Sequence, residues 1–128
     1  MVIVDTTVWI DYLGGTVNTE TEWLDREMPR QRIGLTDMIV CEVLQGIRDE
    51  KQFVAIKQHF ENLIYLDADR STFELGASIY RDLRRSGTTI RNSIDCLIAA
   101  TVIQHGVNFL ERDRDYKFID EHFPLNRL

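Results

Sequence analysis

Short apolar runs that alternate with helical segments are the feature that most constrains the fold of this chain. Such runs lie at residues 2–5 (VIVD), 32–35 (RIGL), 64–66 (IYL) and 107–110 (VNFL). Each is too short for a helix, and its apolar residues are typical of a buried strand. Strands that are apolar on both faces occur in parallel sheets that helices cover on both sides.

The segments between these runs have the periodicity and the end signals of helices. Gly14 and Gly15 end the first helix, Pro29 ends the second, and Gly87 and Gly106 end two later ones. The predicted helices cover residues 6–13, 18–28, 38–47, 50–62, 70–86 and 92–105, and a short C-terminal helix follows Tyr116; residues 123–125 are compatible with the start of a last strand. The alternation predicts one α/β domain over residues 1–128, with a mostly parallel sheet of about four or five strands flanked by helices.

Composition limits the classes of function. The chain carries 15 basic and 21 acidic residues, a net charge of −6, which argues against a large basic nucleic-acid surface but does not exclude nucleic acid as a ligand. We find no signal-peptide pattern, and the apolar runs are shorter than the ~20 residues of a membrane span, so we expect a cytoplasmic protein. The two cysteines and three histidines lack the spacing of a zinc site.

Five acids occupy positions where a carboxylate is unexpected. Asp5 ends the first strand, Glu42 lies among apolar residues in the middle of a helix, and Asp95 lies in the first turn of the apolar helix 92–105. Asp113 and Asp115 follow the strand 107–110. The carboxyl ends of parallel strands meet at one edge of the sheet, where ligands bind in such folds. We therefore expect Asp5 and Asp113 to lie close together.

Each acid, taken alone, has a purely structural explanation. Asp5 fits the N-cap of the next helix, and Asp95 fits the third position of a capping box that Asn92 would open. Glu42 fits a solvent-facing position at the edge of its helix, since glutamates are mostly exposed. Asp113 and Asp115 fit loop acids that pair with Arg112 and Arg114.

Taken together, the acids indicate a metal site. Carboxylates that converge in a partly buried place repel each other and lose hydration, and they stay ionised only beside a cation. An all-oxygen set of ligands suits Mg²⁺, and Mn²⁺ is a substitute. Such a site can activate water and stabilise charge on a phosphate during phosphodiester hydrolysis. The five acids would also account for most of the net negative charge.

Two other folds with acids at strand ends fit less well. A phosphoacceptor receiver domain needs a pair of acids after its first strand, and a haloacid-type phosphatase needs a DxD motif there. Here Asp5 stands alone, followed by Thr6 and Thr7. A non-catalytic RNA-binding or partner-binding domain remains an alternative, and it predicts that changing the acids to amides alters neither RNA integrity nor metal binding.

Four segments in order carry a resemblance to a known family: VIVDTTVWIDYL, IVCEVLQGI, TTIRNSIDCLIAA and ERDRDY. With them the chain resembles the PIN-domain ribonucleases, specifically the VapC toxins of bacterial and archaeal toxin–antitoxin modules. The resemblance implies a Rossmann-like PIN fold and a Mg²⁺- or Mn²⁺-dependent endoribonuclease that cuts structured RNA, transfer RNA or a ribosomal RNA loop, and thereby stops translation. It also implies a homodimer that assembles with a VapB-type antitoxin into a heterotetramer or a larger complex.

The resemblance assigns roles to particular residues. The catalytic, metal-binding acidic quartet would be Asp5, Glu42, Asp95 and Asp113, and Asp115 would be the additional acid that some members place near the metal. Thr6 and Thr7 stand where the family has small hydroxyl residues that orient the first acid or its waters.

Residues that flank the acids have two interpretations each. Arg91, Arg112 and Arg114 could contact RNA phosphates or could simply pair with neighbouring acids. Tyr116 could stack on a base, although a place in the core fits it better. Cys41 and Cys96 each adjoin a proposed acid, and because one residue turns a helix by about 100°, we expect both thiols to face the core.

Overall fold

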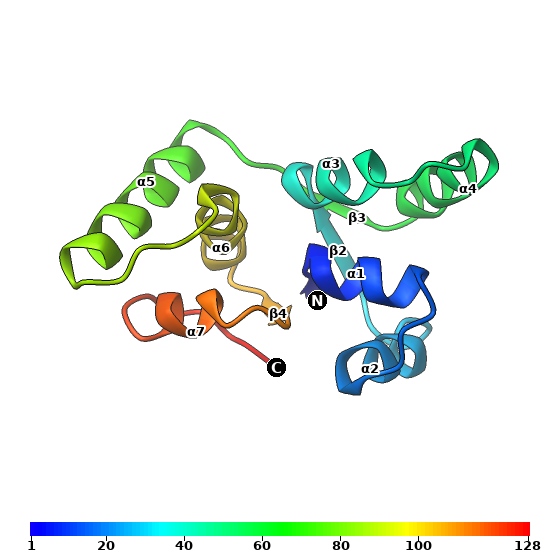
Figure 1. The fold of residues 1–128 in the computed structure, drawn as a ribbon, viewed down its shortest axis with the longest axis horizontal. Coiled ribbons are helices and arrows are strands. Elements are labelled where there is room, and N and C mark those ends of the chain that lie inside the picture. Colours follow the sequence, from blue (N-terminus) through cyan, green and yellow to red (C-terminus); the bar gives the residue numbers. More distant parts are fainter.

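The protein folds around a four-stranded parallel sheet (Figure 1). The computed structural model describes all 128 residues. The strands are β1 (Val2–Val4), β2 (Ile33–Thr36), β3 (Ile64–Leu66) and β4 (Asn108–Leu110), in the spatial order β3-β2-β1-β4. All three strand pairs are parallel. The predicted α/β class and its parallel sheet are thus confirmed.

The order of the strands creates a crevice beside β1. From β1 the chain proceeds outward through β2 and β3, and it then returns to place β4 on the other side of β1. Val2 pairs with Ile33 of β2 and with Asn108 of β4, so β1 is central and fully buried. Where the strand order reverses in this way, the adjacent connections leave in opposite directions, and ligands bind beyond the carboxyl ends of the two strands.

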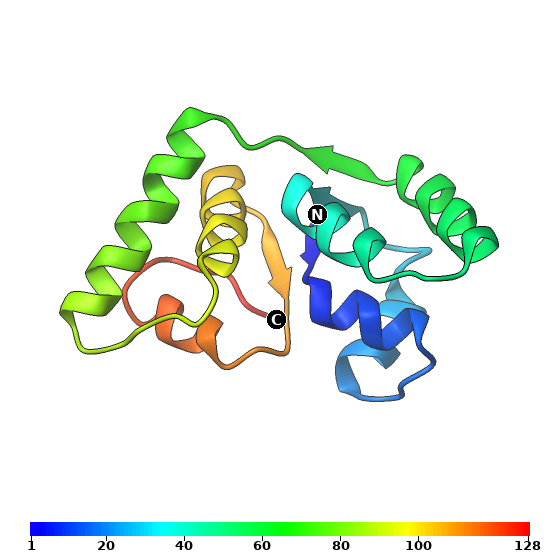
Figure 2. The same cartoon turned by 45° about the horizontal axis from the view of Figure 1, so that its top comes forward.

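Seven helices cover the sheet. They are α1 (Thr6–Leu13), α2 (Thr19–Glu27), α3 (Asp37–Gln45), α4 (Glu50–Glu61), α5 (Arg70–Arg85), α6 (Ser93–His105) and α7 (Asp115–Asp120). Both views show α5, α6 and α7 grouped on one side of β1 and β4, with α1 through α4 grouped on the other (Figures 1 and 2). No helix is both long enough and apolar enough to span a lipid bilayer.

A single apolar core fixes the strand ends in place. Twenty-five buried hydrophobic residues form one contiguous cluster. It includes Ile3 of β1, Leu35 of β2 and Phe109 of β4, all with no exposed surface, and Trp9 of α1 packs edge-on against Phe60 of α4. Because these residues lie within a few positions of the strand ends, the core also positions the residues directly after each strand.

The C-terminal segment forms no fifth strand at residues 123–125, so that prediction is wrong. Instead, the tail makes one isolated parallel bridge, between Arg127 and Phe109 of β4. Pro124 has no N–H to donate to a sheet, and the N–H of Leu125 donates to the side chain of Asp120 at 3.2 Å. Local side-chain bonding therefore replaces a regular strand.

The prediction for the two cysteines is half right. Cys96 is buried, but Cys41 is exposed. Helix α3 packs into the core through Ile39 and Val43, which are four residues apart on one face. Cys41 is two residues from each, which places it on the opposite face of the helix.

Truncation of Ile3 should show how strongly the core holds β1. We expect Ile3→Ala to lower the free energy of unfolding by about 2–5 kcal/mol, because it removes a fully buried side chain and leaves a cavity. Urea denaturation followed by circular dichroism measures this. Val54→Ala is the matched control, since Val54 is 42% exposed and should cost less than about 0.5 kcal/mol. Equal losses in the two variants would contradict this account of the core.

Candidate metal centre

All five predicted acids line one hollow beyond the carboxyl ends of β1 and β4. Its ten residues come from α1 with the residue before it, from α3, from the start of α6 with its preceding loop, from the loop after β4 and from the start of α7: Asp5, Thr6, Thr7, Ile10, Glu42, Arg91, Asn92, Asp95, Asp113 and Asp115. Its volume is about 340 Å³. The structure therefore brings together acids that lie up to 110 positions apart in the chain.

Three of the acids form a compact group. Asp95, Asp113 and Asp115 each offer one carboxylate oxygen, and these three oxygens lie within 4.8 Å of one another. The side chain of Asp113 is 22% exposed and that of Asp115 only 5% exposed. A cation at this place would be reached by Asp113 of the β4–α7 connection, Asp115 at the start of α7 and Asp95 of α6.

The phenol of Tyr116 joins this group to Asp5. Its hydroxyl donates to Asp5 Oδ1 at 3.0 Å and lies 3.3 Å from Asp95 Oδ1, so one buried hydroxyl serves two carboxylates. The ring has no exposed surface and packs edge-on against Phe109, with the ring centroids 4.8 Å apart. The base-stacking interpretation of Tyr116 is therefore wrong, and the core interpretation is right but incomplete.

The two threonines hold the remaining acids. Thr6 Oγ1 donates to Glu42 Oε1 at 2.8 Å, which ties α1 to α3, and Thr7 Oγ1 donates to Asp5 Oδ2 at 3.1 Å. Asp5 occupies the N-cap position of α1, yet its side chain forms no capping bond with the helix. The simple capping explanation of Asp5 is thus wrong, because both carboxylate oxygens are held by hydroxyl groups of the site.

Asp95 is not part of a capping box either. Asn92 caps α6 by accepting the N–H of Ile94 at 3.0 Å. The reciprocal bond from residue 95 does not form, and the side chain of Asp95 has only the Tyr116 hydroxyl as a hydrogen-bond partner. The carboxylate is free to face the hollow.

Burial and mutual repulsion raise the pKa values of two acids. Burial is the main cause for Asp5, whose pKa rises to about 6 even though the Tyr116 hydrogen bond acts in the opposite direction. The pKa of Asp95 rises to about 7, through burial first and then through the charges of Asp5, Asp113 and Glu42. With such pKa values Asp95 is about half protonated at neutral pH and Asp5 takes up its proton in slightly more acidic solution, whereas a cation beside them would keep both ionised.

The three arginines near the acids have different surroundings. Arg91 bridges two acids, with Nη2 at 3.3 Å from Asp113 and Nε at 3.4 Å from Asp115, and its side chain is 65% exposed. Arg112 pairs with Glu20 at 3.1 Å. The pairing interpretation therefore holds for Arg91, and for Arg112 with Glu20 as its partner, whereas Arg114 forms no ion pair. The expected pairing of Asp113 and Asp115 with Arg112 and Arg114 is wrong, because Arg91 binds both acids. Arg91 keeps enough exposed surface to meet a ligand as well.

These residues fit a hard divalent cation. The site offers carboxylate oxygens and no nitrogen or sulfur ligand, and this donor set suits Mg²⁺ or Mn²⁺. The raised pKa values have the same implication, because a bound cation would favour the ionised carboxylates that the site otherwise disfavours. The identity of the metal and the ligand role of each acid stay predictions.

Comparison with known proteins identifies the family. The PIN domain model matches residues 2–121. Ribonuclease VapC11 of Mycobacterium tuberculosis is 33% identical over 122 residues, which cover 93% of this chain and 91% of that protein. The chain belongs to the VapC family of PIN-domain ribonucleases. A second VapC-family relative, ribonuclease VapC19 of the same species, is 25% identical over 125 residues, which cover 98% of this chain and 94% of that protein.

Solved structures of VapC and VapBC proteins share the fold. VapBC2 from Rickettsia felis, solved with a promoter DNA fragment, has a TM-score of 0.77 at 15% identity, with 100% of this chain and 98% of that chain covered. VapC20 of Mycobacterium tuberculosis, described as a sarcin-ricin loop cleaving toxin, has a TM-score of 0.68 at 16% identity, with 96% of both chains covered. The family and fold that the four sequence segments predicted are confirmed.

The metal-free protein should lose stability as the pH rises. The folded state holds protons on Asp5 and Asp95 that the unfolded state has released, so stability is highest near the ordinary carboxyl pKa and falls as the pH passes through about 6 to 7. We expect the melting temperature in EDTA to drop by at least about 3 °C between pH 5 and pH 8. Mn²⁺ added at pH 8 should reverse the drop, and Asp95→Asn should reduce it. A melting temperature that rises with pH would contradict this account.

Loss of the Tyr116 hydroxyl should weaken metal binding without unfolding the chain. In Tyr116→Phe the ring still packs on Phe109, but Asp5 and Asp95 lose their shared donor. Partners that orient metal ligands are worth about 10–100-fold in affinity. We therefore expect the Kd for Mn²⁺, measured by isothermal titration calorimetry, to rise at least about tenfold. Tyr80→Phe on α5, away from the hollow, is the control.

Proposed function

We propose that this VapC-family chain is the toxin of a VapBC-type toxin–antitoxin module and acts as a divalent-metal-dependent endoribonuclease. It would hydrolyse phosphodiester bonds in structured RNA, transfer RNA or ribosomal RNA, and so inhibit translation. One observation carries the proposal: five carboxylates from four separate segments line one hollow at the reversal of the strand order. A fold that only bound a partner would gain nothing from burying like charges together.

The proposed roles follow the contacts in the hollow. Asp5, Glu42, Asp95 and Asp113 would hold Mg²⁺, with Mn²⁺ as a substitute, and Asp115 would assist. A bound divalent cation would supply an activated water and stabilise negative charge on the scissile phosphate. The hydroxyls of Thr6, Thr7 and Tyr116 hold the carboxylates in orientation, because each donates to an acid of the set.

Arginines at the edge of the hollow would orient the RNA. Arg91 lines the hollow and pairs with Asp113 and Asp115, while Arg112 and Arg114 lie in the connection between β4 and α7. A guanidinium keeps unused N–H groups when it binds one carboxylate oxygen, and these can bind a phosphate. We propose that all three contact backbone phosphates near the cleaved bond. The description of VapC20 as a sarcin-ricin loop cleaving toxin supports a structured RNA as the substrate class.

An antitoxin of the VapB type is the proposed partner. Relatives of the same fold have been solved as toxin–antitoxin complexes, among them those from Rickettsia felis and Klebsiella pneumoniae. Beside the acids lies an apolar hollow between α1, α3 and α4, whose apolar residues include Leu13, Val43, Ile47 and Ile56. Ile10 lines both hollows and is 51% exposed, so an apolar segment bound there would end next to the acids. We also propose a homodimer as the toxin's own assembly.

The alternative is a non-catalytic RNA-binding or partner-binding domain of the same fold. It shares the sheet, the core and the arginines with the proposed nuclease. It differs in one outcome, because it assigns no chemical role to the acids.

Sequencing of RNA 5′ ends after brief induction separates these possibilities. The wild-type chain should produce a few discrete new ends in transfer or ribosomal RNA, and Asp95→Asn should reduce them by about 100-fold or more, since it removes a carboxylate of the compact acid group. Asp82→Asn, an exposed change of the same kind on α5, should leave them unchanged. Equal patterns from wild type and Asp95→Asn would contradict the proposed nuclease.

A further inference from the structure

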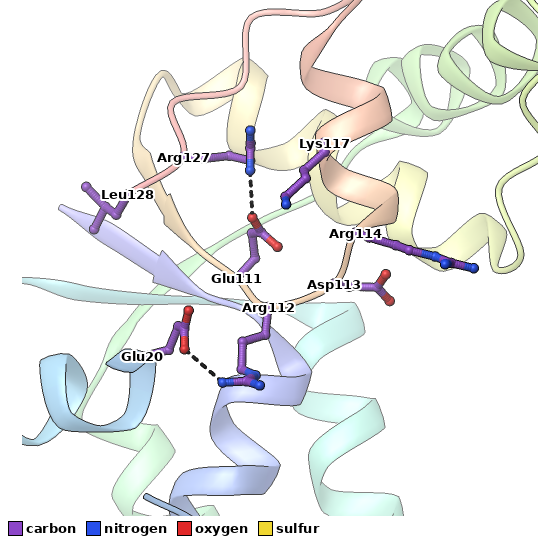
Figure 3. Close-up of a pocket in the computed structure, with 8 residues that line it drawn as sticks. All are labelled: Glu20, Glu111, Arg112, Asp113, Arg114, Lys117, Arg127 and Leu128. Carbon is purple, nitrogen blue, oxygen red and sulfur yellow. Dashed lines mark hydrogen bonds and ion pairs between the residues drawn. The ribbon is translucent and has the colours of Figure 1, made fainter. Parts of the chain in front are cut away.

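A second hollow, of about 360 Å³, lies next to the acids on the other side of the β4–α7 connection (Figure 3). Its wall is formed by the start of α2, the connection itself, α7 and the C-terminal segment: Glu20, Glu111, Arg112, Asp113, Arg114, Lys117, Arg127 and Leu128. Leu128 is its one apolar residue. The volume is at the lower end of the range for ligand sites, but the polar lining does not suit an apolar ligand.

The four cations of this hollow divide into two kinds. Arg112 is paired with Glu20, and Arg127 is paired with Glu111 at 3.2 Å and with Asp120 at 3.1 Å. Figure 3 shows these two pairs at different sides of the hollow. By contrast, Arg114 and Lys117 are exposed and form no ion pair. Of the three acids of the wall, Glu20 and Glu111 are thus paired within it and Asp113 is paired with Arg91, so two cations of the wall have no acidic partner.

A third hollow connects this one to the acids. It is lined by Thr7, Asp11, Arg91, Arg112, Asp113 and Arg114, with no hydrophobic residue among them. It shares Thr7 and Arg91 with the acid hollow, and it shares Arg112 and Arg114 with the second hollow. Asp113 lines all three. The three hollows therefore form one polar furrow that runs from the acids, over the β4–α7 connection, to α7.

We infer that this furrow holds the RNA strand next to the cleaved bond, and that Arg114 and Lys117 bind two of its phosphates. The inference rests on the proposed ribonuclease function and gives the strand a direction, from the acid centre toward α7 and the C-terminal segment. A strand of nucleic acid carries a phosphate at every nucleotide. When the scissile phosphate of such a strand lies at the acids, the neighbouring phosphates lie at successive places along the furrow. Cations of the furrow, Arg114 and Lys117 among them, lie where they can bind these neighbouring phosphates.

The ion pairs of Arg127 give the second hollow its shape. Arg127 bonds to Asp120 at the end of α7 and to Glu111 directly after β4, while its backbone is bridged to Phe109. The side chain of Glu111 is 7% exposed, so little of its negative charge reaches the solvent. The wall that faces the strand is thereby fixed, and Lys117 extends from α7 on the same side of the hollow as Arg127 (Figure 3).

RNA binding by variants without cleavage activity tests the inference. In an Asp95→Asn background, unfractionated transfer RNA is titrated by fluorescence anisotropy at several salt concentrations. We expect the added change Arg114→Ala/Lys117→Ala to raise Kd on the order of tenfold and to make the slope of log K against log salt shallower by about 1.4 to 1.8, the value for two lost phosphate contacts. Lys51→Ala/Lys57→Ala removes the same charge from exposed positions on α4 and should do neither.

The outcomes distinguish this inference from the proposed function. In the chain that retains Asp95, the Arg114/Lys117 variant should cleave with a raised KM and a nearly unchanged kcat, whereas Asp95→Asn lowers kcat. If the chain cleaves RNA and the Arg114/Lys117 pair behaves like the Lys51/Lys57 pair, the inference is overturned and the nuclease stands. If the chain binds transfer RNA through these cations but never cleaves it, the furrow stands and the nuclease fails. If the variant loses affinity for an acidic peptide and not for RNA, the furrow is a protein-binding surface and the inference is overturned.

Discussion

The repulsion between buried carboxylates is the constraint on which the rest of the site depends. Asp5 and Asp95 share one phenolic hydroxyl and lie in a place where burial disfavours their charge. Burying such a cluster lowers the free energy of unfolding, so the packing and hydrogen bonds of the surrounding structure must offset this loss. The central strand β1 does so, because it is buried on both faces and bonded on both edges directly before Asp5.

The strand order brings the mutually repelling carboxylates together in one site. Because β4 lies next to β1, Asp113 and Asp115 after β4 lie close to Asp5 after β1. Helix α6, which packs against α5 and α7, contributes Asp95 to the same site. Hydroxyl groups then hold the carboxylates in orientation, since Thr6, Thr7 and Tyr116 each donate a hydrogen bond to one of them. The carboxylates are therefore held by hydroxyl groups from two segments that lie far apart in the chain, α1 and α7.

The sequence predicted the features that depend on local pattern, and it did not predict those that depend on tertiary contact. The four strands and the positions of the acids follow from short apolar runs and from carboxylates that interrupt them. The donor role of Tyr116 could not be predicted in this way. The sequence around a tyrosine that follows two acids is the same whether its side chain faces solvent, an RNA base or the core. The exposed Cys41 was predicted wrongly for a related reason, since the buried face of α3 is set by the packing of Ile39 and Val43. The expected last strand failed because Leu125 bonds to a side chain instead of a neighbouring strand.

The protein and its proposed RNA substrate both carry a net negative charge. The positions of the charged residues explain how the two can still bind. Surface charges more than about 8 Å apart are largely screened at physiological salt, so an RNA strand responds to the groups beside it and little to the net charge of −6. Near the proposed path, the acids other than Asp11 are either grouped where a cation would neutralise them or paired with Arg91, Arg112 or Arg127. Asp11 accepts a hydrogen bond from the side-chain amide of Asn18 at 3.3 Å. Arg114 and Lys117 stay unpaired beside these acids. An acidic protein can thus present a polyanion with a locally favourable surface, provided that its carboxylates are concentrated where they serve the chemistry.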